Sequence, residues 1–263
     1  MADLISCPVV VAVPARLESS RLPGKVLADI AGRPMLRRVL ERCAQARGVD
    51  HVVVCTDSEL VREATATWGF AALITSPRCS SGSERLASVV DQLVEAAGGL
   101  AADTLVINVQ GDQPLLDPAV IEAIVERFLA LGAPPVLTPV YPLGSEKLHD
   151  PSVVKVLRAQ DGRAITFSRS ALPHVRGLAP ELWTSRATYW GHVGVYGYRG
   201  DVLAGWNALP HSPLEELEKL EQLRLVEAGI PIVTFAVPHD CFSVDTPEQL
   251  QQARGLVAAS GAD

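Results

Sequence analysis

Three cationic residues stand close together in a polar segment that follows the first apolar run of the chain. Arg16, Arg21 and Lys25 belong to PARLESSRLPGK at 14–25. Their guanidinium and ammonium groups can donate charge-assisted hydrogen bonds to phosphate oxygens, and Gly24 lets backbone approach closely. The segment has neither the GxxxxGK[ST] nor the GxGxxG pattern. It indicates a phosphate-binding loop, with a solvated loop of incidental charge as the competing interpretation.

An aspartate has the position expected of a metal ligand. Asp112 belongs to QGDQP, directly after the apolar run 105–109. A carboxylate at the end of a central strand can hold Mg²⁺ between the protein and substrate phosphates. Asp112 is equally suited to open a turn before Pro114, so both interpretations stay open.

A third polar segment, CSSGSER at 79–85, carries a helix-start pattern. Ser81 and Glu84 have the spacing of a capping box, in which each side chain accepts a backbone N–H of the other end of the turn. Free N–H groups at such a helix start also offer a site for a base or an anion. The segment is therefore a candidate for either role.

A carboxylate interrupts an apolar stripe in the second half of the chain. In a helix expected over 213–228, Glu221 lies within roughly 40° of Leu214, Leu217 and Leu225 on the helical wheel. A carboxylate there needs a partner. Sugar hydroxyls would serve, and so would a buried arginine such as Arg169.

His192 begins an expected strand over 189–198. Gly194 and Gly197 inside that strand would let a sugar lie close to the backbone. A histidine held by structural hydrogen bonds is the alternative.

The elements that must position these residues alternate between apolar β-branched runs and amphipathic stretches, which predicts βαβ units and a parallel sheet. After residue 132 prolines cluster, and runs at 153–157 and 164–167 predict a hairpin turning at 160–162. We therefore expect an α/β domain over 1–135, an inserted α+β subdomain over 136–228, and a return to the α/β domain over 229–263. The alternating runs are 9–13 then 34–46, 52–55 then 59–68, 104–109 then 119–131, and finally 230–237 then 247–258.

Composition excludes several classes of protein. A net charge of −7 over 263 residues argues against nucleic-acid binding. No apolar run approaches the roughly 18 residues needed to span a membrane. The start, MADLISCPVVVAV, is typical of a first strand and not of a signal peptide. Five scattered cysteines without zinc spacing indicate free thiols, and we expect a cytoplasmic protein.

Taken together and in order, the motifs resemble those of the 3-deoxy-manno-octulosonate (Kdo) cytidylyltransferases, the CMP-Kdo synthetase family. The resemblance spans nearly the whole chain, and YGYR together with LEQLR is its most specific part. The motifs are PARLESSRLPGKVL at 14–27, SGSER at 81–85, QGDQP at 110–114, FSRSALP at 167–173, HVGVYGYR at 192–199, SPLEELEKLEQLR at 212–224 and VDTPE at 244–248.

The resemblance implies a homodimer with a Rossmann-like nucleotidyltransferase sheet and an inserted sugar-binding and dimerisation subdomain. It implies transfer of CMP from CTP to the anomeric hydroxyl of Kdo, with Mg²⁺ as cofactor, for lipopolysaccharide synthesis. Arg21, Lys25, Asp112 and Asp245 would be catalytic, and the two aspartates would bind the metal. The nucleotide would contact Pro14, Ala15, Arg16, Arg21, Lys25, Ser81, Gly82 and Asp112, and the sugar would contact Gln110, Arg169, His192, Tyr196, Glu221 and Gln222.

Local departures from the family pattern bear on specificity. Cys79-Ser80 replaces the usual His-Gln, QGDQP replaces QGDEP, and Ser243 replaces a common glycine before Asp245. Two alternatives to Kdo transfer follow. One is a cytidylyltransferase for 8-amino-Kdo or sialic acid, and the other is a non-catalytic nucleotide-binding relative.

Overall fold

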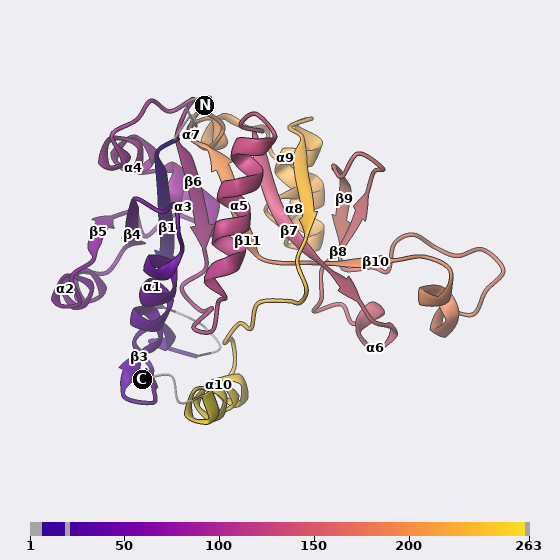
Figure 1. The fold of residues 1–263 in the computed structure, drawn as a ribbon, viewed down its shortest axis with the longest axis horizontal. Helices are drawn as coiled ribbons and strands as arrows, with labels where there is room; N and C mark the ends of the chain where they lie inside the picture. The colour runs from indigo at the N-terminus through magenta and orange to yellow at the C-terminus, as the bar shows by residue number, and fades with distance from the viewer. Residues whose placement is uncertain (1–6, 19–21, 261–263) are drawn as a thin grey trace, which may run out of the picture.

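The computed structural model describes residues 7–18 and 22–260. Within them, ten strands form one mixed sheet in the order β5-β4-β1-β6-β11-β7-β10-β8-β9, and β12 also pairs with β7 (Figure 1). The strands are β1 Val9–Ala15, β4 His51–Thr56, β5 Ala71–Ile74, β6 Leu105–Val109, β7 Val136–Leu143, β8 Lys155–Arg158, β9 Ala164–Ser168, β10 Tyr189–His192, β11 Val195–Arg199 and β12 Ile232–Ala236; β2 Asp29–Ile30 and β3 Arg33–Pro34 form a separate hairpin.

Strands β1, β4, β5 and β6 run parallel, as the βαβ pattern predicts. Alternate residues of β1 point to opposite faces, so Val11 and Val13 join one hydrophobic core and Val10 joins the other. Helices α1 Met35–Gln45 and α5 Pro118–Ala130 cover the first face and lie in front of the sheet in Figure 1. The opposite face is covered by α3 Gly82–Ala87, α4 Val90–Ala97, α7 Gly200–Ala204 and α9 Leu223–Glu227.

The helix starts mostly follow the sequence signals. The Ser81 hydroxyl accepts the N–H of Glu84 at the start of α3, and Asp117 accepts the N–H of Ala119 at the start of α5. Pro34 precedes α1 without belonging to it, because its ψ of 142° is outside the helical range. Helix α2 Glu59–Thr67 begins after Ser58.

The second half of the chain contains the predicted hairpin, β8 and β9, which turns at Gly162 with φ of 88°. The strand predicted over 189–198 follows one edge of β7 but contains a bulge. His192 pairs with Val140, whereas Gly197 pairs with Leu137. Extra residues around 193–194 therefore separate β10 from β11.

The continuous helix expected over 213–228 is wrong. Helix α8 Pro213–Glu218 ends at Lys219, whose φ of 53° is left-handed, and α9 starts only at Leu223. The break occurs because Glu221 turns away to accept the backbone N–H of Ser83 in α3. The interaction with α3 thus replaces the helical ladder.

Helix α10 Pro247–Ser260 packs against the β2–β3 hairpin, where Leu250 and Ala253 join Ile30, Met35 and Val244 in a separate small core. The chain also forms the short helix α6 Ser145–Leu148 and 3-10 turns at Lys25–Leu27, Pro180–Ser185 and Trp206–Ala208.

No helix in the described part of the chain is long and apolar enough to cross a membrane. Strands from all three predicted segments, 1–135, 136–228 and 229–263, share the one sheet.

Candidate functional site

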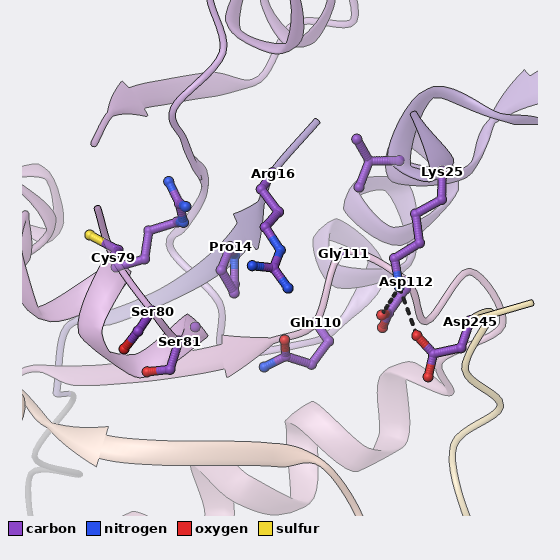
Figure 2. A pocket seen from close by; sticks show the side chains of 13 residues that line it. Pro14, Arg16, Lys25, Cys79, Ser80, Ser81, Gln110, Gly111, Asp112 and Asp245 are labelled. Atoms are coloured by element: carbon purple, nitrogen blue, oxygen red, sulfur yellow. Dashed lines mark hydrogen bonds and ion pairs between the residues drawn. The ribbon is translucent and has the colours of Figure 1, made fainter. Parts of the chain in front are cut away.

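A cleft of about 220 Å³ opens at the carboxyl ends of β1 and β6 (Figure 2). It brings together the three polar segments that the sequence singled out, because parallel neighbouring strands end at the same edge of the sheet. Asp245 joins them from the carboxyl-terminal part of the chain. The cleft is lined by Pro14, Arg16, Lys25, Val26, Cys79, Ser80, Ser81, Gly82, Arg85, Gln110, Gly111, Asp112 and Asp245.

One ammonium group joins two carboxylates at one end of the cleft. Lys25 Nζ lies 2.7 Å from Asp112 Oδ2 and 3.0 Å from Asp245 Oδ1 (Figure 2), and it also donates to the carbonyl of Val244 at 3.3 Å. Burial disfavours the ammonium charge, but the two carboxylates outweigh burial and raise the pKa of Lys25 above its ordinary value. The Lys25 ammonium is therefore charged at neutral pH.

Local backbone geometry places each member of this cluster. Gly24 has φ of 68°, which glycine adopts without strain, and it starts the 3-10 turn that carries Lys25. A Cβ at Gly24 would meet no protein atom within 4 Å, so the positive φ of the turn is what favours glycine here, and the close approach to phosphate stays a prediction. Val244 N donates to Asp112 O at 2.9 Å, which ties the Asp245 segment to the end of β6.

The start of α10 next to Asp245 is capped by Thr246 and Gln249. The Thr246 hydroxyl accepts the N–H of Gln249, and the Gln249 side chain accepts the N–H groups of Asp245 and Thr246. This is a capping box completed without the Asp245 carboxylate. That carboxylate instead contacts Lys25.

The start of α3 forms the opposite wall of the cleft. The Ser81 hydroxyl accepts the N–H of Glu84, and the Glu84 carboxylate accepts the N–H of Ser80 at 2.7 Å, so both side chains stabilise the helix start. A Cβ at Gly82 would lie 3.3 Å from Pro14 Cγ and 3.4 Å from Gln110 Nε2. Glycine thus lets the start of α3 approach the ends of β1 and β6.

Arg85 lines the cleft and was not among the predicted site residues. Its guanidinium is buried, donates to Asp57 Oδ2 at 2.7 Å, and hydrogen-bonds the hydroxyl of Thr75. The Arg85 guanidinium is therefore already paired with residues of the loop between β4 and α2 and of the loop between β5 and α3. The SGSER motif carried a signal for this residue, but the capping box accounted for the motif without it.

The remaining predicted nucleotide contacts divide into three groups. Arg16 is exposed and lines the cleft. Ala15 is only 2% exposed and its side chain belongs to the core beside the cleft. Arg21 lies outside the described residues, so its predicted role stays a prediction.

Glu221 lies behind α3 and not on a helix face. It lines a second cavity of about 400 Å³ together with Ser80 and Ser81, which also line the first cleft. Burial raises the pKa of Glu221, against hydrogen bonds from the side chains of Ser81 and Ser83 that favour its charged form. The partners of the carboxylate are thus α3 groups, and neither of the partners suggested by the sequence is needed to explain its position.

Arg169 has a different partner from the one considered. Its backbone N–H and the hydroxyl of Ser168 donate to the Glu218 carboxylate, and its guanidinium donates to the Glu218 carbonyl at 2.7 Å and to the Pro151 carbonyl at 2.9 Å. The pairing joins α8 to β9. Arg169 lines neither of the two cavities described above.

The rings of His192 and Tyr196 lie next to each other, and Tyr196 is buried. Burial lowers the pKa of His192 to about 3, and its Nε2 is 3.0 Å from the Thr138 hydroxyl. The His192 ring is 5.1 Å from Phe167 and 5.2 Å from Tyr196. The imidazole is therefore neutral at working pH.

Gln222 is 2% exposed, and within the described residues its Nε2 has no hydrogen-bond partner. A buried amide without a partner is costly, so this group is available to an added ligand or water. The structure does not bring Gln222, His192, Tyr196 and Arg169 into the lining of the first cleft. Among the predicted sugar contacts, only Gln110 lines it.

Of the two strand glycines that the sequence analysis named, Gly197 leaves no room for a sugar, whereas Gly194 does. A Cβ at Gly197 would lie 2.8 Å from Ile124 Cγ2, so this glycine admits α5. At Gly194 the nearest atom would be Gln113 Nε2 at 3.9 Å. Close packing explains Gly197, while the surroundings of Gly194 stay open.

Comparison with known proteins matches this geometry to one family. The family model described as Cytidylyltransferase matches residues 10–232. The 3-deoxy-manno-octulosonate cytidylyltransferase of Myxococcus xanthus (strain DK1622) is 41% identical over 260 residues, covering 97% of this chain and 99% of the relative. The protein of that name from Escherichia coli is 41% identical over 249 residues, covering 95% and 96%.

A solved structure of CMP:2-keto-3-deoxy-manno-octonic acid synthetase complexed with CTP superimposes with a TM-score of 0.87 at 39% identity, covering 96% of this chain and 99% of the other. The α/β nucleotidyltransferase fold predicted from the sequence is thereby confirmed. The likeness extends over nearly the full length of both chains. This chain belongs to the 3-deoxy-manno-octulosonate cytidylyltransferase family of cytidylyltransferases.

Proposed function

We propose that the protein transfers CMP from CTP to the anomeric hydroxyl of Kdo and releases pyrophosphate. The observation that carries the proposal is the cluster of Lys25, Asp112 and Asp245 in a cleft at the ends of β1 and β6. The chain is 41% identical to a protein named for this activity, and the solved structure that it resembles, with a TM-score of 0.87, was determined with CTP. The product would serve lipopolysaccharide synthesis.

The reaction is an in-line displacement. The anomeric oxygen attacks the α-phosphorus of CTP, the bond from that phosphorus to the bridging oxygen of the β-phosphate breaks, and the hydroxyl proton passes to solvent. Such chemistry depends on positioning and charge balance more than on a covalent nucleophile. No histidine lines the cleft in the part of the chain that the structure describes.

The cations of the cleft would balance the triphosphate. Arg16 is exposed at the cleft and can turn to phosphate oxygens, and Arg21 belongs to the same sequence segment, 14–25. Lys25 donates to carboxylates in the free protein, and phosphate oxygens offer it equivalent acceptors. Ser81 and Gly82 line the same cleft and would contact the nucleotide.

The two aspartates fit a magnesium ion. Their oxygens already converge on one cationic nitrogen, within 2.7 and 3.0 Å, and both are hard oxygen donors. No group of three acidic, histidine or cysteine side chains gathers in the described residues, so phosphate oxygens and water would supply the other ligands. When bound, the ion would withdraw charge from the α-phosphate and the attacking oxygen.

The sugar would enter beside Gln110 and toward Glu221, since Ser80 and Ser81 line both cavities. Tyr196, His192, Gln222 and Arg169 would then support this region from behind the first cleft. His192 would contribute a neutral ring, because burial lowers its pKa to about 3.

We also propose that the protein works in the cytoplasm as a homodimer. All five cysteines are free thiols, which suits a reducing compartment. Leu214 and Leu217 on one face of α8 are 41% and 80% exposed, which suits burial against a second copy. Sedimentation of the Leu217→Lys variant tests the dimer, which should dissociate while the isolated chain stays folded.

A pyrophosphate-release assay tests the activity. Four nucleoside triphosphates are crossed with Kdo, 8-amino-Kdo and sialic acid, with Mg²⁺ present and then removed by chelation. We expect turnover with CTP and Kdo, and its loss without Mg²⁺. Equal turnover with ATP or GTP would contradict CTP preference, faster use of 8-amino-Kdo or sialic acid would favour a sibling activity, and no turnover at all would favour a non-catalytic relative.

A further inference from the structure

Three polar residues behind the cleft are fully buried and have no role in the proposed reaction. Ser83, Asn108 and Tyr198 are each 0% exposed. Asn108 belongs to β6, whose other residues are all apolar, and Ser83 belongs to α3. Buried polar groups are costly unless they are hydrogen-bonded, so their partners show what the arrangement holds in place.

The hydrogen bonds connect the two cavities. Gln110 Nε2 donates to Asn108 Oδ1 at 3.1 Å, and Asn108 Nδ2 donates to Ser83 Oγ at 3.4 Å. The Ser83 N–H donates to Glu221 Oε2 at 3.2 Å, and the Ser83 hydroxyl also stabilises the charged form of Glu221. Tyr198 Oη lies 3.0 Å from Ser83 Oγ as a side branch.

The direction of each hydrogen bond follows from the groups around Ser83. The Ser83 hydroxyl oxygen has two lone pairs, and it accepts from Asn108 Nδ2. Because Asn108 Nδ2 donates to Ser83, Asn108 Oδ1 is the atom that faces Gln110. An amide oxygen only accepts, so Gln110 must donate to it through Nε2.

We propose that Ser83 is a positioning residue for the sugar: through Asn108 it fixes the Gln110 side chain so that its carbonyl oxygen faces the cleft. Figure 2 shows that oxygen turned toward the Arg16 side of the cleft. The site therefore presents an acceptor, which binds a sugar hydroxyl and disfavours a sugar carboxylate. The inference rests on the proposed function for the identity of the ligand.

The first test is a double-mutant cycle with steady-state kinetics. Ser83→Ala removes the link, and we expect KM for Kdo to rise about tenfold, as for one lost hydrogen bond, while KM for CTP changes less than about twofold. Gln110→Ala should raise KM for Kdo similarly. Because both changes remove the same contact, the double variant should be less than about twofold worse than Gln110→Ala alone.

Matched variants separate positioning from structural support. Tyr198→Phe removes a hydroxyl from the same Ser83 oxygen but leaves the path from Gln110 to Glu221 intact, so KM for Kdo should stay within about twofold. Ser83→Thr keeps the hydroxyl and should restore sugar use. Independent, multiplying effects of Ser83→Ala and Gln110→Ala, or a Tyr198→Phe effect equal to that of Ser83→Ala, would overturn the proposal.

A second measurement needs neither variant nor turnover. In the free wild-type protein, NMR hydrogen exchange of the Gln110 side-chain amide should be slowed relative to the exposed Gln160, since one proton is bonded to buried Asn108. Exchange as fast as that of Gln160 would overturn the relay even if Ser83→Ala fails to fold. Slow exchange in a protein that does not use CTP and Kdo would refute the proposed function and leave the arrangement of Gln110 standing.

Discussion

Replacing Asp245 by asparagine separates the charge of this residue from its place at the start of α10. The helix is capped by Thr246 and Gln249, so the substitution should leave the cap intact. Asp245 is about one-third exposed, and its ion pair with Lys25 contributes less than about 1 kcal/mol. Because Lys25 keeps Asp112 as a partner at 2.7 Å, we expect the melting temperature to fall by less than about 3 °C.

The effect on turnover should be much larger. Two unit charges about 4 Å apart attract by about 4 kcal/mol at the effective dielectric near a protein surface, and a divalent cation doubles that attraction. Lost hydration offsets much of the gain. If about 3 kcal/mol survives, kcat/KM falls on the order of 100-fold, and the concentration of Mg²⁺ needed for half-maximal rate rises.

The assay is pyrophosphate release from CTP and Kdo over a magnesium titration, beside thermal melting of the same samples. Thr246→Ala is the matched control, because it removes the cap of α10 and leaves the Asp245 carboxylate. We expect it to lose about 1 kcal/mol of stability with turnover within about twofold. Normal turnover of Asp245→Asn at low Mg²⁺, or an equal loss in Thr246→Ala, would refute the metal role of Asp245.

Three further outcomes follow from the site. Lys25→Met should bind Mn²⁺ more tightly than the wild type in the absence of CTP, as measured by paramagnetic resonance, because it removes an ammonium that competes for both aspartates. Unchanged binding would contradict this competition. Glu221→Gln should weaken use of Kdo about tenfold with CTP affinity nearly kept, whereas Glu221→Ala should weaken both, since Glu221 holds the start of α3. Because burial lowers the pKa of His192, the histidine takes up a proton in the unfolded chain at a higher pH than in the folded chain. The free energy of unfolding should therefore decline as pH falls from about 6.5 toward 3, with a loss of about 2 kcal/mol at pH 5. His192→Gln should flatten that decline in urea titrations.

The sequence predicted the cleft because strand topology decides where loops meet. Apolar runs ending at residues 13, 55 and 109 required parallel strands, and the polar segments that follow two of them had to share one edge. The helix starts at Ser81 and Asp117 could be predicted because each depends only on hydrogen bonds within one turn of the chain.

The errors arose where a long-range contact outweighed a local pattern. The periodicity of 213–228 fits one helix, yet Glu221 leaves it to bond α3, 138 residues earlier in the chain. The apolar stripe built on Leu214 and Leu217 is instead exposed. One signal was available and was missed: Asn108 is a polar residue inside the otherwise apolar run 105–109, where only buried partners could stabilise it.

The cluster around Lys25 also suggests how the nucleotide must enter. Lys25 pairs with both Asp112 and Asp245 beside the segment 14–25, so its ammonium is engaged before any ligand binds. Of the described cations that line the cleft, Arg85 is committed to Asp57, which leaves Arg16 exposed for the ligand. A triphosphate brings more negative charge than Arg16 and Arg21 together can offset, so nucleotide and divalent cation should bind together, with Lys25 moving from the carboxylates to the phosphates as they arrive.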